Sequence, residues 1–282
     1  MTFISAIIAK EGVVVSTDSK ELLQGGNLLW QDFDDILQKK GTDEEDQKEC
    51  ISPFEITEKF KASAQINKGR IRSIDGATKI FQIGTHSVIL VAGAANPSGK
   101  EFEAIIDEIK KLIDISSNNT LSNIKDITFS TIEKYISQDK SEDRFSSEYL
   151  FCGYDIEENR FKVIKFFFND KRVMENGQFV KDENGKYIEE KYFMHYDTNQ
   201  ILNTAGWKEY VGELGVFNHQ MKSISIVQAF RLSKNIMNLV VTIEEIVNKI
   251  TGIGGRNYTA IIIKSGFFWV DSETQVMNLM RH

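Results

Sequence analysis

The sequence predicts an α+β fold in which two antiparallel sheets stack face to face between outer pairs of helices, a four-layer αββα sandwich. Three observations lead to this expectation. Apolar, β-branched segments occur in closely spaced pairs separated by short turns, which is typical of hairpins. Two stretches of the chain change to the spacing of amphipathic helices. No internal repeat or Pro- or Ser-rich linker interrupts the chain, so we expect one domain over residues 1–282.

The first element is a hairpin. Residues 2–9 and 13–17 are rich in Ile and Val, and the turn Lys10-Glu11-Gly12 separates them. From about 19 to 77 the chain has no comparable pattern and carries Gly25-Gly26 and an acidic run. Loops of this length inside a compact domain are usually functional or disordered, so we interpret the segment as an insertion, helical in part around 28–37 and partly mobile.

A second hairpin and two helices follow. Residues 79–83 and 87–92 are strand-like and flank the turn at 84–86. Apolar residues then recur at spacings of three and four, which predicts an amphipathic helix: Phe102, Ile105, Ile106, Ile109, Leu112 and Ile113. A similar stripe predicts the second helix of the pair: Ile124, Ile127, Ile132, Tyr135 and Ile136.

The second half repeats this order. A third hairpin is expected over 149–154 and 161–168, and a hairpin extension over about 169–190 carries Asn-Gly turns at 176–177 and 184–185. A strand at 191–195 precedes two helices, roughly 207–217 and 223–250. The last hairpin covers 258–264 and 267–270. The long helix has apolar residues on more than one face, including Leu232 and Val241 and, just beyond it, Ile253, which predicts a partner surface.

The charge and composition of the chain exclude several classes of function. The net charge of −7 argues against a nucleic-acid or anionic membrane surface, and no apolar run is long enough to span a bilayer. The start shows no secretory signal, and Cys50 and Cys152 lack metal-binding spacing, so we expect free thiols in a reducing cytoplasm. The four histidines are scattered. We therefore expect neither metal nor cofactor.

The most informative residue is Thr2. A small residue after Met1 permits removal of the methionine, and Thr2 would then carry both a hydroxyl and a free α-amine. The amine has an ordinary pKa of about 7.7–8.0 and can take the hydroxyl proton near neutral pH. Residue 2 alone proves nothing, so the hypothesis depends on the residues downstream.

Three further residues occur at defined distances along the sequence from Thr2 and from one another. Asp18 lies sixteen positions after Thr2, in Gly-Val-Val-Val-Ser-Thr-Asp-Ser (12–19); Lys79 opens Lys-Ile-Phe-Gln-Ile (79–83); and Gly93 lies fourteen positions after Lys79 in an Ala-Gly turn. In these segments the chain resembles the β-type proteasome subunits of the N-terminal nucleophile hydrolases, as a divergent member of bacterial type. The motif match is strong at 2–19 and 78–95, and as topology it covers about two-thirds of the chain.

The resemblance implies the site. Thr2 would be the nucleophile with its own amine as base, and Lys79 a cation that favours the alkoxide. Asp18 would orient Lys79, and the Gly93 N–H would face the oxyanion. By position Glu21, Val91 and Ala95 would line the specificity pocket. The reaction would be hydrolysis of a peptide or amide through an acyl-enzyme, in a homo-oligomeric ring or stacked assembly.

The sequence also departs from the family. The 19–77 segment is far longer than usual, and where the family has an Asp and a Ser just before a Gly-Gly, this chain has Ile250 and Ile253, with only Thr251 offering a hydroxyl. Two other functions therefore stay open: a catalytically silent ring or scaffold subunit, and a small-molecule amidase whose insertion caps a narrow pocket. The family's silent α-type subunits begin with a helix that this chain lacks, which favours the β type.

Overall fold

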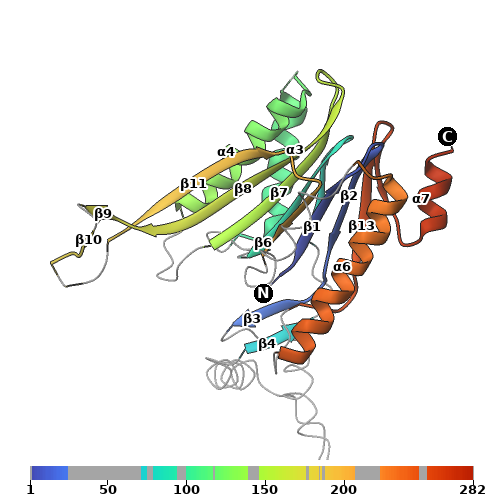
Figure 1. The fold of residues 1–282 in the computed structure, drawn as a ribbon. Coiled ribbons are helices and arrows are strands. Elements are labelled where there is room, and N and C mark those ends of the chain that lie inside the picture. Colours follow the sequence, from blue (N-terminus) through green and yellow to red (C-terminus); the bar gives the residue numbers. More distant parts are fainter. Residues whose placement is uncertain are drawn as a thin grey trace, which may run out of the picture.

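The structure is a computed structural model that describes residues 2–24, 71–74, 79–93, 100–116, 118–138, 146–175, 178–183, 185, 188–206, 223–247 and 253–281. Within these ranges it contains two five-stranded antiparallel sheets, two two-stranded sheets and four helices (Figure 1). The predicted α+β class with two antiparallel sheets is therefore confirmed.

The first large sheet, which we call the N-terminal sheet, has the strand order β12-β1-β2-β13-β14. Its strands are β1 (Ile4–Ile8), β2 (Gly12–Thr17), β12 (Leu202–Ala205), β13 (Tyr258–Ile263) and β14 (Gly266–Trp269). The first and last predicted hairpins both exist, and β13 pairs with β2 to join them. Strand β12, which the sequence pattern did not predict, extends the sheet beside β1.

The second large sheet, which we call the central sheet, has the order β11-β8-β7-β6-β5. Its strands are β5 (Ile80–Gly84), β6 (Ser87–Gly93), β7 (Ser146–Asp155), β8 (Arg160–Arg172) and β11 (Glu189–Thr198). Both hairpins predicted here are present, and β6 pairs with β7 to unite them. Strands β7, β8 and β11 extend beyond the apolar cores from which they were predicted.

Three apolar clusters separate four layers. Helices α3 (Phe102–Ile115) and α4 (Leu121–Gln138) pack on the outer face of the central sheet. A second cluster joins the two sheets, through residues such as Val15 and Leu90. The third joins the N-terminal sheet to α6 (Ile226–Val247) and the short α7 (Glu273–Leu279). The helices therefore cover the two outer faces of the stacked sheets, as Figure 1 shows.

Strand alternation explains this layering. In β6, Val88, Leu90 and Ala92 belong to the cluster between the sheets, whereas Ile89 and Val91 belong to the cluster under α3 and α4. Because successive strand residues point to opposite faces, a strand with both faces covered needs an unbroken apolar run. The segment 88–92 meets that requirement.

The helix predictions were correct for α3, α4 and most of α6, while 207–217 and 28–37 lie outside the described residues. Helix α7 was missed, because its single buried residue, Val276, gives no apolar stripe. No helix in the described part of the chain is long and apolar enough to cross a membrane.

The expected partner surface on α6 needs a correction. Leu232 and Val241 pack partly buried against the cluster under α6, and Ile253 is fully buried there. These side chains are covered by the chain itself. The large apolar side chains that remain exposed in the described part of α6 are Leu239 and Ile246, at 49% and 78%.

Two smaller sheets occupy the predicted insertion and extension. Strands β3 (Glu21–Gln24) and β4 (Ile71–Ile74) pair with each other within the insertion. Strands β9 (Met174–Glu175) and β10 (Gln178–Phe179) form the predicted extension hairpin, which projects from the end of β8 and β11 in Figure 1. The insertion thus contains a strand pair that sequence periodicity did not predict.

Candidate functional site

The residues predicted to form the site lie where four strands begin or end. Thr2 precedes β1, Asp18 follows β2, Lys79 precedes β5 and Gly93 ends β6. The β1–β2 register pairs Ile4 with Thr17, so the chain around Thr2 runs beside Asp18. Stacking the two sheets then brings the start of β5 to the same place.

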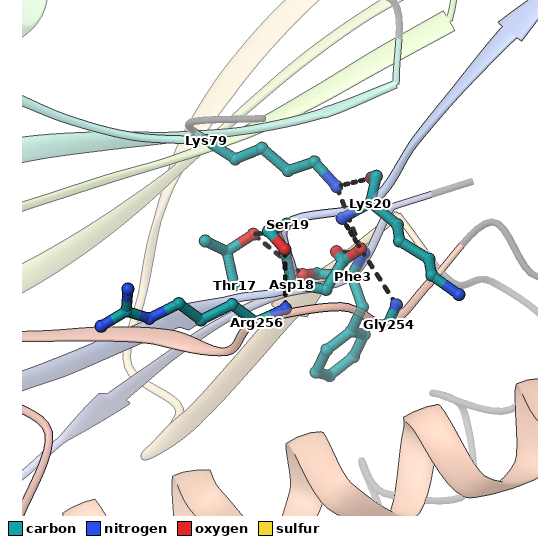
Figure 2. A network of polar contacts seen from close by, with 8 residues as sticks. All are labelled: Phe3, Thr17, Asp18, Ser19, Lys20, Lys79, Gly254 and Arg256. Carbon is teal, nitrogen blue, oxygen red and sulfur yellow. Dashed lines mark hydrogen bonds and ion pairs between the residues drawn. The ribbon is translucent and has the colours of Figure 1, made fainter. Parts of the chain in front are cut away.

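Asp18 is the centre of the hydrogen-bond network (Figure 2). Its Oδ1 accepts the N–H of Phe3 at 3.0 Å. Its Oδ2 accepts the Lys79 ammonium at 3.1 Å and two backbone N–H groups, those of Lys20 at 3.2 Å and Gly254 at 3.3 Å. One fully buried carboxylate therefore ties together three segments that are distant in the sequence.

Lys79 is almost as deeply buried as its partner, with its side chain 8% exposed against 0% for that of Asp18. Its ammonium also donates to the carbonyl oxygen of Lys20. The side chain crosses from the edge of the central sheet to the end of β2 (Figure 2). A buried charge is tolerated only when it is paired and hydrogen-bonded, and both conditions hold here.

The electrostatics of the pair are set by two opposing effects. Burial raises the pKa of Asp18 above its ordinary value, whereas the charge of Lys79 and the N–H donors of Phe3 and Gly254 lower it. Burial is the larger effect. The carboxylate therefore depends on Lys79 to remain charged, and the two residues act as one electrostatic unit.

The loop before β13 holds this arrangement from the other side. Gly254 accepts the N–H of Ser19 at 3.1 Å, in addition to its own donation to Asp18. The N–H of Arg256 donates to the Ser19 hydroxyl at 2.7 Å. The sequence offered one hint of this contact, the Gly254-Gly255 pair, and both glycines have positive φ. Ser19 ends the segment 12–19 that carries the resemblance, but no contact was predicted for it, and Arg256 gave no sequence signal.

Thr2 itself is fixed by close packing. A Cβ added to Gly206 would lie 2.1 Å from the Thr2 carbonyl oxygen and 3.0 Å from the Ala92 Cβ. The φ of Gly206 is +96°, which also favours glycine. The Thr2–Phe3 peptide is thus held by Asp18 through its N–H and by Gly206 against its carbonyl, with Ala92 alongside. Thr2 is 9% exposed.

The remaining residues that were predicted for the site, Gly93 and the three expected to line the specificity pocket, lie in different surroundings. Gly93 ends β6 with φ +104°, a left-handed conformation that favours glycine, and it is exposed. Val91 is buried in the cluster under α3, at 4% exposure. Glu21 opens β3, while Ala95 lies outside the described residues. Their proposed roles in specificity stay predictions.

The two isoleucines at positions where the resemblance implies polar residues have different outcomes. Ile253 is fully buried among apolar side chains under α6, so it offers the site no polar group. Ile250 and Thr251 lie outside the described residues. The structure therefore brings together Thr2, Asp18, Lys79 and Gly254, and adds the backbone of Phe3 and Lys20 and the close contact of Gly206.

Comparison with known proteins leaves the site to be interpreted from its own geometry: no protein-family model matches the chain, and no curated protein matches it significantly.

Proposed function

We propose that the chain is an N-terminal threonine hydrolase, a peptidase or amidase of the proteasome β-type, in which removal of Met1 exposes Thr2. The observation that carries this proposal is the buried Lys79–Asp18 pair, whose carboxylate holds the Phe3 N–H directly beside Thr2. Burying two charges costs free energy. The pair binds the chain at the start of β1 through the Phe3 N–H. That location is explained if the Lys79 cation acts on the Thr2 hydroxyl.

The proposed reaction has two steps. The Thr2 hydroxyl attacks the substrate carbonyl while the Thr2 amine takes the hydroxyl proton, and that proton then passes to the departing amine. This forms an ester between Thr2 and the acyl group. Water attacks the ester in the second step, which releases the acid and restores the hydroxyl.

Lys79, Asp18 and Gly93 have supporting roles in this proposal. A positive charge beside the hydroxyl favours its deprotonated form, which is the role of Lys79. Asp18 keeps Lys79 charged and fixes its direction. The Gly93 N–H donates to the oxyanion that develops on the substrate carbonyl, where the absence of a side chain allows close approach.

The layered fold supports the same proposal. Two stacked antiparallel sheets between helix layers, with the nucleophile at the start of a central strand, is the arrangement that the resemblance to N-terminal nucleophile hydrolases implies. The observed strand joins at β2–β13 and β6–β7 are compatible with it. Function does not follow from fold alone, so the chemistry of Thr2 has to be tested directly.

A second candidate is a catalytically silent subunit of the same fold. The observation in its favour is Ile253, which is buried in an apolar cluster where the resemblance implies a polar supporting residue. Loss of supporting polar groups can abolish activity even when the reacting groups are present.

The deciding experiment has two readouts on the same protein. The intact mass shows whether Met1 has been removed, and a peptide epoxyketone or β-lactone, mapped by mass spectrometry, shows whether Thr2 is reactive. Thr2→Ala is the matched control, because alanine is also small enough to permit removal of Met1 but has no hydroxyl. Thr2→Ser should retain the adduct.

The outcomes separate the candidates. An adduct on Thr2 that is absent in Thr2→Ala supports the hydrolase. A chain that lacks Met1, is folded and forms no adduct supports the silent subunit. Hydrolysis of small amides but not of peptides would instead support the small-molecule amidase.

We also propose that the chain forms a homo-oligomer, as a ring or stacked assembly whose Thr2 sites face an enclosed space. The exposed Leu239 and Ile246 lie seven residues apart on α6 and therefore on one side of the helix. Light scattering tests this proposal. A stable monomer across micromolar concentrations with reactive Thr2 would exclude the enclosed assembly and favour the stand-alone amidase.

A further inference from the structure

A cavity of about 420 Å³ lies beside the candidate site but is lined by none of Thr2, Asp18 and Gly93. Its lining consists of Thr17, Lys79 and Ile80, of residues 256–259 at the start of β13, and of residues 269–271 at the end of β14 and Gln275 of α7. Its volume lies within the range of small-molecule sites, which is about 300–1,000 Å³. Figure 2 shows that the Lys79 ammonium and the Arg256 side chain point in opposite directions.

The cavity has an aromatic wall. Tyr258 and Trp269 both line it, with their rings in a T-shaped arrangement and their centroids 6.4 Å apart. Trp269 is 52% exposed. A large aromatic side chain left half in water beside a cavity is typical of binding surfaces, because a flat apolar ligand can cover it.

A cation stands beside this wall. The Arg256 guanidinium lies 5.4 Å from the centre of the Tyr258 ring, and no carboxylate of the described residues is within ion-pair distance of it. Lys79 also lines the cavity, but Asp18 neutralises it. Arg256 is therefore the group that would bind a carboxylate, through the parallel N–H donors of its guanidinium.

Acceptors lie on the same lining. Asp271 lines the cavity and is exposed, and it directly follows Val270, whose N–H donates to the Thr259 carbonyl at 3.0 Å. Asn257 also lines the cavity, and its Oδ1 is covered and has no hydrogen-bond partner among the residues that the structure describes. The terminal torsion of Asn is broad, so a small turn brings this oxygen to a ligand donor and satisfies it.

These groups together define a ligand. Arg256 offers donors to an anion, Asp271 and the Asn257 oxygen offer acceptors to a cationic donor, and the aromatic rings offer a surface to a flat apolar group. We propose that the cavity binds a free α-amino acid with an aromatic side chain, its carboxylate on Arg256, its ammonium on Asp271 and Asn257, and its ring against Trp269 and Tyr258. A simple anion is a poorer fit, because Asp271 would repel it.

The test is calorimetric titration of the whole protein with L-phenylalanine and two analogues. Phenylalanine amide lacks the carboxylate, and N-acetyl-phenylalanine lacks the ammonium and imitates the last residue of a peptide. We expect saturable binding of L-phenylalanine and at least tenfold weaker binding of both analogues. Thr2→Ala should bind equally well, because Thr2 does not line the cavity.

Two variants locate the binding. Arg256→Gln should weaken L-phenylalanine binding at least tenfold, and because Arg256 is exposed the fold should be unaffected. Arg160→Gln removes the same charge at the start of β8, outside the lining of the cavity, and this variant should bind L-phenylalanine as the parent does. No measurable binding of L-phenylalanine, or equal binding by Arg256→Gln, would overturn the proposal. Equal binding of N-acetyl-phenylalanine would also overturn it and assign the cavity to a peptide C-terminus.

Discussion

Two charged clusters at different depths respond in opposite ways to their surroundings. Asp18 is fully buried with Lys79, and burial raises its pKa. Glu108 on α3 is 30% exposed and accepts from Tyr135, Lys134 and Lys100, and these hydrogen bonds lower its pKa to about 2. Burial therefore opposes the charged form of the carboxylate at the candidate site, whereas hydrogen bonds favour the charged form on the helix layer. The comparison teaches that the depth of a carboxylate, and not the presence of a lysine beside it, decides the direction of its pKa shift.

The largest expected effect concerns activity. If the proposed function is correct, Lys79→Ala should lower turnover by about 10⁴-fold, as loss of one member of a nucleophile–base system can do. Lys134→Ala removes a lysine from the exposed cluster and should leave turnover unchanged. Both are measured on protein shown to be folded and to lack Met1. Turnover of Lys79→Ala near that of the parent would exclude Lys79 from the mechanism.

The next effect is on stability. Lys79→Met preserves the aliphatic stem but leaves Asp18 buried without a counter-charge, so we expect a loss of about 3–5 kcal/mol in the free energy of unfolding. Adding Asp18→Asn removes that stranded charge and should restore about 1–3 kcal/mol. Urea unfolding of the two single variants, the double variant and the parent measures the coupling. Additive effects would mean that the two residues do not act as a unit.

The pH dependence should have opposite signs in the two clusters. The folded pKa of Glu108 is below its ordinary value of 4.5, so its stabilisation is present above about pH 4.5 and lost as the pH falls towards 2. Because the side chain is partly exposed, we expect about 1 kcal/mol. The folded pKa of Asp18 is above 3.8, so its contribution is present below that pH and lost as the pH rises.

Two variants isolate these slopes. Glu108→Gln should remove the acid-side loss, and Asp18→Asn should remove the loss at rising pH. Both are measured by urea unfolding at several values between pH 2 and 7. A parent profile that Asp18→Asn leaves unchanged would show that the carboxyl has the same pKa in the folded and unfolded chain.

The smallest effect is expected at a surface pair. Arg231 on α6 contacts Glu273 on α7 through two parallel hydrogen bonds, both at 2.7 Å, and the two side chains are 60% and 36% exposed. Arg231→Gln should shift the unfolding midpoint less than any variant above, and about 0.5 M salt should remove the difference by screening. A shift as large as that of Lys79→Met would show that α7 depends on this pair for its attachment.

The sequence by itself determined the local elements. Paired apolar segments with short turns identified four hairpins, and the change to a 3.6-residue period identified α3, α4 and α6, because these patterns depend only on which side chains must be buried. It failed for β3, β4, β12 and α7, because elements of four to seven residues are too short to show a periodic apolar pattern. It also named Thr2, Asp18, Lys79 and Gly93 through motif spacing.

Only the tertiary structure decided how these elements join. The pairing of β2 with β13 and of β6 with β7, and the burial of Lys79 against Asp18, connect residues that are distant in the chain. The contacts of Asp18 with the N–H groups of Phe3 and Gly254 are made by backbone atoms, which every residue possesses and no sequence pattern marks. The close fit of Gly206 against Thr2 likewise depends on where two strand ends meet, and that position exists only once both sheets are packed.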